Sequence, residues 1–571
     1  MFQLSAIALF FILLIIGLGF FLSALFPAIT AQRRNWFSPF WLGFASLIGI
    51  LQIWHFFLPV NGLVLALLFL ISLIGWFTIL KNGLLPVISK KIWIWMVVVL
   101  VFFVFSNHAI FSQPGYDLGL YHMQTVKWFN QFPIVPGLGN LQHRFAFNSS
   151  NYLFAAFMNT AIFHGTGYYT ATLILVIMLV LESLSTFKNW LNNTSAKSKY
   201  MLYKIILFPI ILWQIGNQPF SGYPADMTIF IVQLAIFGML LRLWDVTTDE
   251  QRFRALFIQI LILTAAAITI KLSSAVFGIL IIAVIFARGY HCFGRLVFVK
   301  RNSLPVFGIL SFWGIPWLLR NVILSGFLFY PSTFLSFDVP WKMPNFLVQD
   351  IQAGITTWAR TNSGHLTYHA DLKWFFLWFK QFVFEARSAF ILTVILIFII
   401  LFLSIRKNYR GIQFKNYLPF LLLVISSLIA WFISAPTYRF SGAIIWIFLI
   451  LSILMLLEWV TVNYSSETAW KTSVIMLLFL FFLLPNGLSR DFSFSTLVTV
   501  TPENQIAQMN QSLERKQVKT TASGLQVNIP AEGESCWDLP LPCTTPNDYL
   551  AGLQLIDPDD MAKGFQISSN K

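Results

Sequence analysis

Charged residues are scarce in this sequence. Asp, Glu, Lys and Arg make up 10% of its 571 residues, whereas 57% are apolar and 17% are aromatic. A typical soluble domain has about 25% charged residues, so this composition excludes an ordinary soluble protein. The sequence also lacks a glycine-rich phosphate loop, a zinc-type Cys/His spacing, an extended basic stripe and an internal repeat. The net charge of +15 is therefore better explained by Lys and Arg at the cytoplasmic ends of membrane helices than by nucleic-acid binding.

Long apolar runs recur along the chain. Each run of about 17–22 residues contains few charges and is long enough to cross a bilayer as a helix. The sequence therefore predicts an all-α polytopic membrane protein with about 14 transmembrane helices. The first run, from Ser5 to Phe26, lacks a preceding basic segment, and we interpret it as a helix and not as a cleaved signal peptide. The expected spans are residues 4–26, 37–58, 62–80, 92–111, 167–187, 201–216, 226–243, 254–270, 273–288, 305–322, 388–405, 416–434, 440–459 and 472–487.

Two other apolar segments differ from these spans. Residues 148–164, NSSNYLFAAFMNTAIFH, are polar at their start and short, so we expect a re-entrant or interfacial helix on the outer side. Residues 371–384, DLKWFFLWFKQFVF, are rich in aromatic residues, which predicts an amphipathic helix lying in the headgroup layer.

The basic residues predict which side of the membrane each connection faces. They cluster at alternate connections, and placing all of these clusters in the cytoplasm satisfies the positive-inside rule. Both termini, residues 112–152 and residues 321–387 then face the outside. The clusters are Arg33/Arg34, Lys81/Lys90/Lys91, Lys188/Lys197/Lys199/Lys204, Arg242/Arg252/Arg254, Arg288/Arg295/Lys300/Arg301 and Arg406/Lys407/Arg410/Lys415.

Two of the three cysteines lie close together in the C-terminal tail. Cys536 and Cys543 are seven residues apart in ESCWDLPLPC, and a disulfide between them would suit an oxidising exterior; two free thiols are the alternative. The tail is polar and too small for a large core. We therefore divide the chain into three additional N-terminal transmembrane helices (1–90), a transmembrane core (91–487) and a small external tail (488–571).

The external loop 112–152 carries the strongest candidates for chemistry. Asp117 follows a predicted span within about six residues, in the sequence Gly-Tyr-Asp-Leu-Gly. Tyr116, which precedes it, is a candidate substrate-binding residue. Loops that carry polar groups on a rigid scaffold are common sites of function. We assign Asp117 a catalytic or metal-binding role. His122 is a candidate to position an acceptor or to contribute to a divalent cation site, with a packing role as the alternative.

Other charged residues are expected on the same outer face. Asp226 begins a predicted helix and is either a second site carboxylate or an acid that complements the helix dipole. Lys271, Arg320 and Arg439 lie at predicted helix ends. Asn321, which follows Arg320, is a further candidate substrate-binding residue. Cations at the lipid boundary suit the phosphate of a lipid-linked substrate. Snorkelling and structural ion pairs are the alternatives.

Several of these segments together resemble the GT-C superfamily of membrane glycosyltransferases, which use polyprenyl-phosphate sugars. Asp117 lies in the first large external loop, as does the acidic residue of that superfamily. PWLLRNVILSGFLFYP at 316–331, TIKLSS at 269–274 and APTYRFSG at 435–442 are similar to segments of its bacterial members. The loop, with YDLGLYH, PIVPGLGN and FNSS, resembles a bacterial multi-pass subgroup associated with cell-surface polysaccharide. The resemblance runs from about residue 90 onward.

The resemblance implies an inverting transfer of a sugar at the outer membrane face. Asp117 would act as general base or position the acceptor hydroxyl. Lys271, Arg320 and Arg439 would hold the lipid phosphate and stabilise charge on the leaving group. Many members pair two acids in this loop. Here Asp117 is alone, Asp226 is the candidate second carboxylate, and the need for a divalent cation stays open.

The same features leave other activities open. A flippase or transporter of lipid-linked oligosaccharide would also bind phosphate through cations, and an O-antigen-type polymerase or ligase would share the donor and the external site. In each case the expected partners are a polyprenyl-phosphate-linked sugar and membrane lipids, with no nucleic acid. The expected location is the inner membrane of a bacterium, with the active face periplasmic.

Overall fold

The computed structural model describes residues 1–25, 35–86, 88–112, 115–192, 198–218, 220–361, 373–385, 414–463, 516–545 and 548–568. In this part of the chain, ten helices are long and apolar enough to cross a membrane, which confirms the predicted all-α polytopic architecture. They are α1 (Phe2–Leu25), α2 (Phe37–Trp54), α3 (Gly62–Lys81), α4 (Ile92–Phe111), α8 (Gly167–Asn192), α9 (Lys199–Asn217), α10 (Ala225–Trp244), α11 (Glu250–Ile270), α12 (Ala275–Phe293) and α13 (Arg295–Ser325).

Two shorter apolar helices coincide with further predicted spans. They are α17 (Leu418–Ser434) and α18 (Ile444–Asn463), at the predicted positions 416–434 and 440–459. The predicted spans 388–405 and 472–487 lie outside the described residues.

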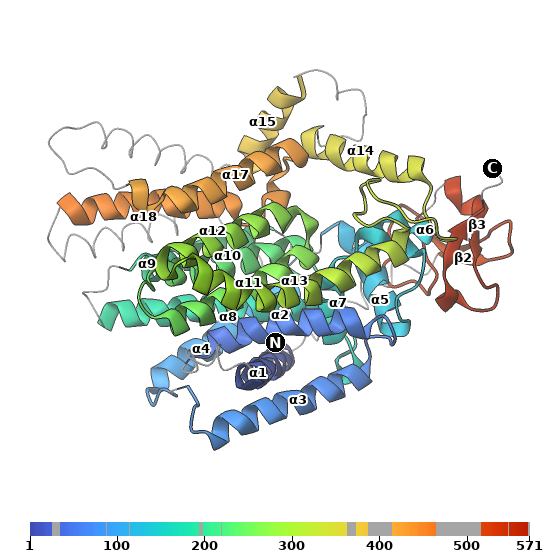
Figure 1. Ribbon diagram of the computed structural model, residues 1–571. Coiled ribbons are helices and arrows are strands. Elements are labelled where there is room, and N and C mark those ends of the chain that lie inside the picture. The colour runs from blue at the N-terminus through green and yellow to red at the C-terminus, as the bar shows by residue number, and fades with distance from the viewer. Residues whose placement is uncertain are drawn as a thin grey trace.

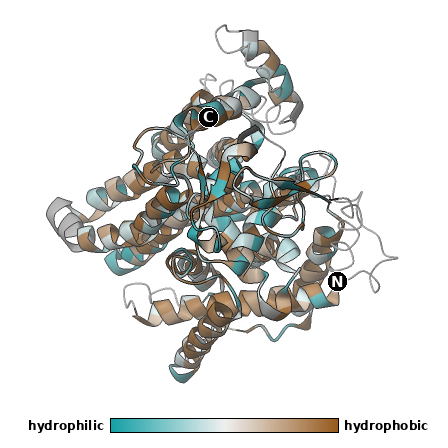
Figure 2. Ribbon diagram, turned by 90° about the vertical axis from the view of Figure 1, so that its right-hand side faces the viewer, coloured by the Kyte–Doolittle hydropathy of each residue, from teal (hydrophilic) through white to brown (hydrophobic). Residues whose placement is uncertain are grey.

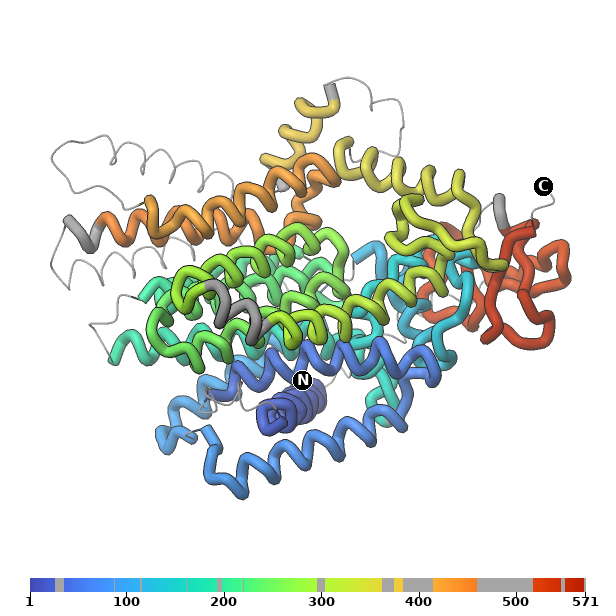
Figure 3. Tube along the Cα trace, in the orientation of Figure 1, coloured from blue at the N-terminus to red at the C-terminus, as the bar shows by residue number. Residues whose placement is uncertain are grey.

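Most of the long helices run side by side, and the two ends of this bundle differ (Figure 1, Figure 3). One end carries helices α5 to α7, helix α14 (Asn345–Thr361) and the C-terminal strands. The other end carries the C-termini of α3 and α10, whose last turns contain Lys81 and Arg242. In Figure 2, which looks onto the first end, hydrophilic residues of the C-terminal strands lie in front of largely hydrophobic helices. The basic helix ends therefore lie opposite the predicted loop.

Helix α1 crosses its neighbours steeply. It is seen almost end-on in Figures 1 and 3, where α2 and α3 run across the view. Small residues allow the backbones to approach closely. A Cβ atom at Gly43 of α2 would lie 1.9 Å from the carbonyl oxygen of Ile15. Helix α2 also packs on α7, α11 and α13, and α1 packs on α4 and α8, so both helices join the N-terminal helices to the rest of the bundle.

The predicted loop folds into a series of short helices. They are the π-helical turn η2 (Leu118–His122), α5 (Met123–Gln131), α6 (Leu138–Leu141), the 3₁₀ helix η3 (His143–Phe147) and α7 (Ser150–Met158). All nine residues of α7 are buried among other helices, and the predicted re-entrant or interfacial position of 148–164 in the membrane stays a prediction. Nine residues reach only about 14 Å, which confirms that α7 does not span a membrane.

The aromatic segment 371–384 coincides with helix α15 (Lys373–Glu385). Its Trp378 packs against Trp431 and Phe432 of α17, while Phe376 is 75% exposed. The helix thus has one packed and one exposed aromatic face, which is consistent with the predicted amphipathic character.

The C-terminal tail forms two small antiparallel sheets. Strand β1 (Lys516–Thr520) pairs with β2 (Gln526–Pro530), and β3 (Leu553–Leu555) pairs with β4 (Phe565–Ile567). Cys536 and Cys543, which follow β2 and precede β3 in the sequence, form a disulfide with each other. This bond confirms the predicted pairing. With so small an apolar core, the tail gains much of its order from the helices on which it rests.

The close crossing of α1 and α2 gives a test of this packing. Replacing Gly43 with Ala places a methyl group against backbone atoms that cannot rotate away, so the helices must separate. We expect the free energy of unfolding to fall by about 1–3 kcal/mol, measured by thermal unfolding in detergent. Gly308→Ala in α13 is the matched control, because nothing lies within 4 Å of its added Cβ atom. Equal stability of the two variants would contradict the packing described here.

Candidate functional site

A cavity of about 190 Å³ brings together residues of the predicted loop and of three helix ends. We call it the loop cavity. Asp117, His122, Asp226 and Arg439 line it, although they are far apart in the sequence. A second cavity, of about 670 Å³, opens at the opposite end of α10 and contains none of the predicted site residues. The loop cavity is therefore the candidate site.

Asp117 directly precedes the π-helical turn η2. Its Oδ2 atom lies 2.9 Å from Nη1 of Arg439, and the two side chains are 25% and 37% exposed. Arg439 belongs to η8 (Tyr438–Ser441), the turn between α17 and α18. Its guanidinium also faces the rings of Trp358 at 4.6 Å and Phe440 at 5.0 Å. Turns of this π type are often found at functional sites.

Asp226 and Lys271 form a second ion pair beside the first. Asp226 is in the first turn of α10, whose N-cap is Pro224, so it complements the helix dipole as well as pairing with Lys271. Lys271 ends α11, and its Nζ atom lies 4.2 Å from the centre of the Phe440 ring. Because Phe440 contacts both cations, the two ion pairs are neighbours. The structure thus brings together four residues predicted from the sequence: Asp117, Asp226, Lys271 and Arg439.

His122 is buried in the wall of the loop cavity. Its Nδ1 atom lies 3.0 Å from the carbonyl oxygen of Gly222, so Nδ1 carries the proton and Nε2 is left as an acceptor. Burial lowers the pKa of His122 to about 4, although Asp117 opposes this effect. At neutral pH the ring is therefore uncharged, which suits a hydrogen-bonding role and not a phosphate-binding one.

Tyr116 lies at the rim of the loop cavity. Its side chain is 68% exposed, and its hydroxyl donates a hydrogen bond to Glu534 of the tail at 3.1 Å. The tail therefore reaches the edge of the cavity through this residue.

Arg320 and Asn321 do not line the loop cavity. Arg320 is 1% exposed and donates hydrogen bonds to His55 Nδ1 at 2.8 Å and to Asn148 Oδ1 at 3.0 Å. Asn321 accepts a hydrogen bond from Asn148 Nδ2 at 2.9 Å and donates one to the Leu328 carbonyl. Arg320 thus holds α13 to the end of α2, and both side chains hold α13 to the end of η3. Their expected role in substrate binding stays a prediction.

Several residues of the cavity were not predicted from the sequence. Tyr438 donates a hydrogen bond to Gln214 Oε1 at 3.0 Å, and Trp446 donates one to the Tyr438 hydroxyl at 2.9 Å. Gln218 and Ser221 line the cavity beside Gln214. A signal for them exists, because the amides interrupt the otherwise apolar end of a span in WQIGNQ.

Within the described residues, no group of three His, Cys, Asp or Glu side chains could hold a metal ion. Asp117, Asp226 and His122 line one cavity, but they do not form such a group. A divalent cation therefore stays a prediction.

Comparison with known proteins assigns the chain to a family but indicates no activity. A family model described as "Domain of unknown function (DUF8201)" matches residues 1–446, which include Asp117, His122, Asp226, Lys271 and Arg439. No curated protein and no solved structure matches this chain.

The low pKa of His122 predicts how stability depends on pH. The pKa is about 4 in the folded protein, whereas an unperturbed histidine has a pKa of 6.5, so stability is complete above pH 6.5 and declines as pH falls towards 4. We expect His122 to account for a loss of about 2–3 kcal/mol between pH 7 and pH 4.5.

The comparison of wild type with His122→Asn isolates this effect. Asn cannot take up the proton but can still donate to Gly222. Burial also lowers the pKa of His143, to about 3, and that contribution cancels because both proteins contain it. Unfolding measured at several pH values should show a shallower decline for the variant. Parallel declines would show that His122 is not a buried neutral ring.

Proposed function

We propose that this chain, which belongs to the family described as "Domain of unknown function (DUF8201)", is a membrane glycosyltransferase. It would move a sugar from a polyprenyl-phosphate-linked donor to an acceptor hydroxyl of a cell-surface glycan, lipid or protein. One observation carries the proposal: Asp117, Asp226 and Arg439 line one cavity at the loop end of the bundle, and Lys271 forms an ion pair with Asp226 beside it.

The two cations suit the phosphate of the donor. Arg439 and Lys271 are held next to each other by the Phe440 ring and by their carboxylate partners. Charge-assisted hydrogen bonds from such groups to phosphate oxygens are stronger than those between neutral groups. A bound phosphate would compete with the carboxylates for the cations. Binding of the donor would then release a carboxylate from its ion pair.

A released carboxylate can accept the proton of the acceptor hydroxyl. As the acceptor oxygen attacks the anomeric carbon, its proton passes to Asp117, and the bond from that carbon to the phosphate oxygen breaks. The electron pair of this bond leaves with the phosphate, where Arg439 and Lys271 stabilise the added charge. Asp226 keeps Lys271 in place until the phosphate arrives. Attack from the side opposite the leaving group inverts the configuration at the anomeric carbon.

The remaining residues of the cavity are neutral hydrogen-bonding groups. Gln214, Gln218 and Tyr438 offer amide and hydroxyl groups of the kind that recognise sugar hydroxyls. A volume of about 190 Å³ is small, so the cavity suits the reacting end of the donor, with the lipid chain outside.

The position of the charges favours a transferase over a flippase. A transporter binds its substrate near the middle of the membrane, between broken helices. Asp226 is in the first turn of α10 and Lys271 follows the last residue of α11, so this charge pair lies at helix ends. A polymerase or ligase would use the same site and would differ in its acceptor.

Asp117→Asn should abolish sugar transfer while the protein remains folded. The Asp117–Arg439 pair is partly exposed, and such pairs contribute only about 0–1 kcal/mol to stability. Loss of transfer activity would therefore indicate a role of the carboxylate in the reaction, and not unfolding of the protein. Surface glycans and lipid-linked sugars are measured by mass spectrometry in a deletion strain that carries each variant.

Asp338→Asn is the matched control, because Asp338 is exposed and lies outside the loop cavity. Full glycan synthesis by Asp117→Asn would rule out the role assigned to this carboxylate. Lipid-linked sugar that stalls on the cytoplasmic side in the deletion strain would instead indicate a flippase.

Arg439→Gln should weaken binding of the donor phosphate. Losing a charge-assisted hydrogen bond of about 1.5–3 kcal/mol corresponds to a roughly 10- to 100-fold weaker affinity. Binding of polyprenyl phosphate is measured by native mass spectrometry, and Arg439→Lys should retain part of it. Arg360→Gln is the control, because Arg360 also faces a tryptophan ring but does not line the cavity. Equal affinity in wild type and Arg439→Gln would contradict the phosphate site.

A further inference from the structure

The C-terminal tail contacts the short segment that carries Asp117 and His122. The backbone N–H of Trp537 donates a hydrogen bond to the carbonyl oxygen of Gly119 at 2.8 Å. Gly119 is in the π-helical turn η2, between the two site residues. A residue more than 400 positions away in the sequence therefore fixes the backbone of the turn.

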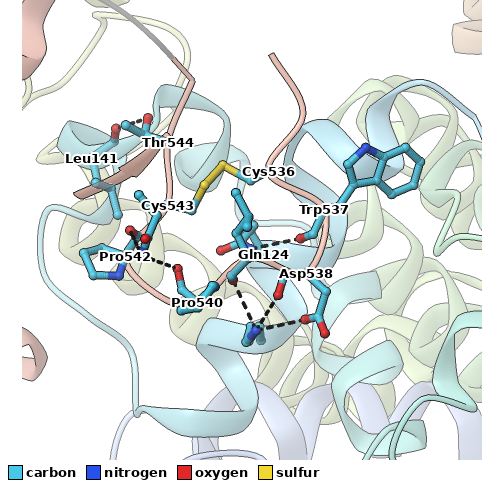
Figure 4. The surroundings of a disulfide bond; sticks show 12 residues. Gln124, Leu141, Cys536, Trp537, Asp538, Pro540, Pro542, Cys543 and Thr544 are labelled. Carbon is cyan, nitrogen blue, oxygen red and sulfur yellow. Dashed lines mark hydrogen bonds and ion pairs between the residues drawn. A yellow bond between two sulfur atoms is a disulfide. The ribbon is translucent and has the colours of Figure 1, made fainter. Parts of the chain in front are cut away.

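Helix α5, which continues η2, holds the same tail segment with two side chains (Figure 4). Gln124 is fully buried, and its Nε2 atom donates to the carbonyl oxygens of Trp537 and Leu539, both at 2.9 Å. The Nζ atom of Lys127 lies 2.9 Å from Oδ1 of Asp538 and 3.0 Å from its carbonyl oxygen. Most of these bonds end on tail carbonyl groups, so they require the tail backbone to hold one particular shape.

The disulfide closes that part of the backbone into a loop. Cys536 and Cys543 flank the residues that contact η2 and α5, and both cysteines are buried. We call residues 536–543 the clamp loop. Next to it, the Thr544 hydroxyl donates to the Leu141 carbonyl at 2.7 Å. Farther along the tail, the backbone N–H of Phe565 donates to the Pro136 carbonyl at 2.9 Å, so the tail also has an anchor away from the clamp loop.

Gly119 and Trp537 fit together tightly. A Cβ atom at Gly119 would lie 2.5 Å from the Trp537 ring, so a residue other than glycine at 119 would push the ring away. The indole therefore packs directly on the backbone of η2. It packs where a shift of the turn would move Asp117 relative to Arg439.

We propose that the clamp loop positions the η2 turn, so that the loop cavity is complete only after the Cys536–Cys543 disulfide has formed. Trp537 is the positioning residue, and it acts through Gly119 on Asp117 and His122. The site would then become active only after the tail has reached an oxidising compartment. The activity measurement below rests on the proposed glycosyltransferase function, whereas the exchange measurement does not.

Hydrogen exchange of the full-length protein in lipid nanodiscs tests the positioning without any substrate. In the Cys536→Ser/Cys543→Ser variant and in Trp537→Ala, we expect peptides covering 115–127 to exchange at least tenfold faster than in wild type. Peptides from α10 should not change. Val518→Ala is the control in the same tail, because Val518 is exposed and its strand β1 pairs with β2. Unchanged exchange at 115–127 in both clamp-loop variants would overturn the proposal.

The contact between Gly119 and Trp537 gives a second, independent test. Gly119→Ala alone should accelerate exchange at 115–127, because the new methyl group displaces the ring. In the Trp537→Ala background the same substitution should add less than a twofold change, since the ring is absent. Independent effects of the two substitutions would show that the ring does not act on η2 through Gly119.

Transfer activity separates this proposal from the proposed function. Trp537→Ala should lower kcat at least tenfold with less than a twofold change in the KM for the donor, because Arg439 and Lys271 remain in place, and Trp537→Phe should restore most of kcat. Faster exchange in a protein that transfers no sugar even as wild type would support the clamp and refute the glycosyltransferase. A fall in kcat without faster exchange would refute the clamp alone.

Discussion

The pairing of two carboxylates with two cations around Phe440 is the constraint on which the candidate site depends. Charges near a membrane are costly unless they are partnered, and this chain contains few of them. Asp117 comes from the loop, Asp226 from α10, Lys271 from the end of α11 and Arg439 from the turn before α18. Four separate elements must therefore be placed correctly before the charges balance. The ion pairs form as a result of the packing of the bundle. They do not drive that packing, because partly exposed pairs add little stability.

The packing itself comes from apolar helices and small residues. Gly43 lets α1 and α2 approach to backbone contact, and α2 then joins α7, α11 and α13. Arg320 belongs to this framework. Its guanidinium lies over the Phe129 ring, and it bonds to His55 at the C-cap of α2, where the negative end of the helix dipole favours a cation. The burial of Arg320 is thus explained by its contacts within this framework.

Sequence reasoning found the spans because apolar runs are long and unambiguous, and it found Asp117, Asp226, Lys271 and Arg439 because charges are rare here. It could not separate Arg439 from Arg320, since both follow the same pattern of a cation at a helix end. The structure distinguishes them, because Arg439 lines the loop cavity and pairs with Asp117, whereas Arg320 is buried among helices. It also overlooked Gln214. Burying a neutral amide in a membrane span costs less free energy than burying a charge, so an amide is a weaker sign of a functional site. The burial of α7 depends on contacts with distant helices, which one sequence does not specify.

The dependence of the loop on the tail follows from the backbone of η2. A π-helical turn is rare and occurs mostly as a single turn within an α-helix, and η2 is bonded to its surroundings on two sides. Around η2 those surroundings are the Gly222 carbonyl, which accepts from His122, and Trp537, which donates to Gly119. The first contact comes from the membrane bundle and the second from the tail. A turn fixed from both sides can place Asp117 against Arg439 with little freedom, and catalysis by a carboxylate requires that restriction. The bundle and the tail therefore both contact the turn that follows Asp117, the residue to which we assign the chemistry.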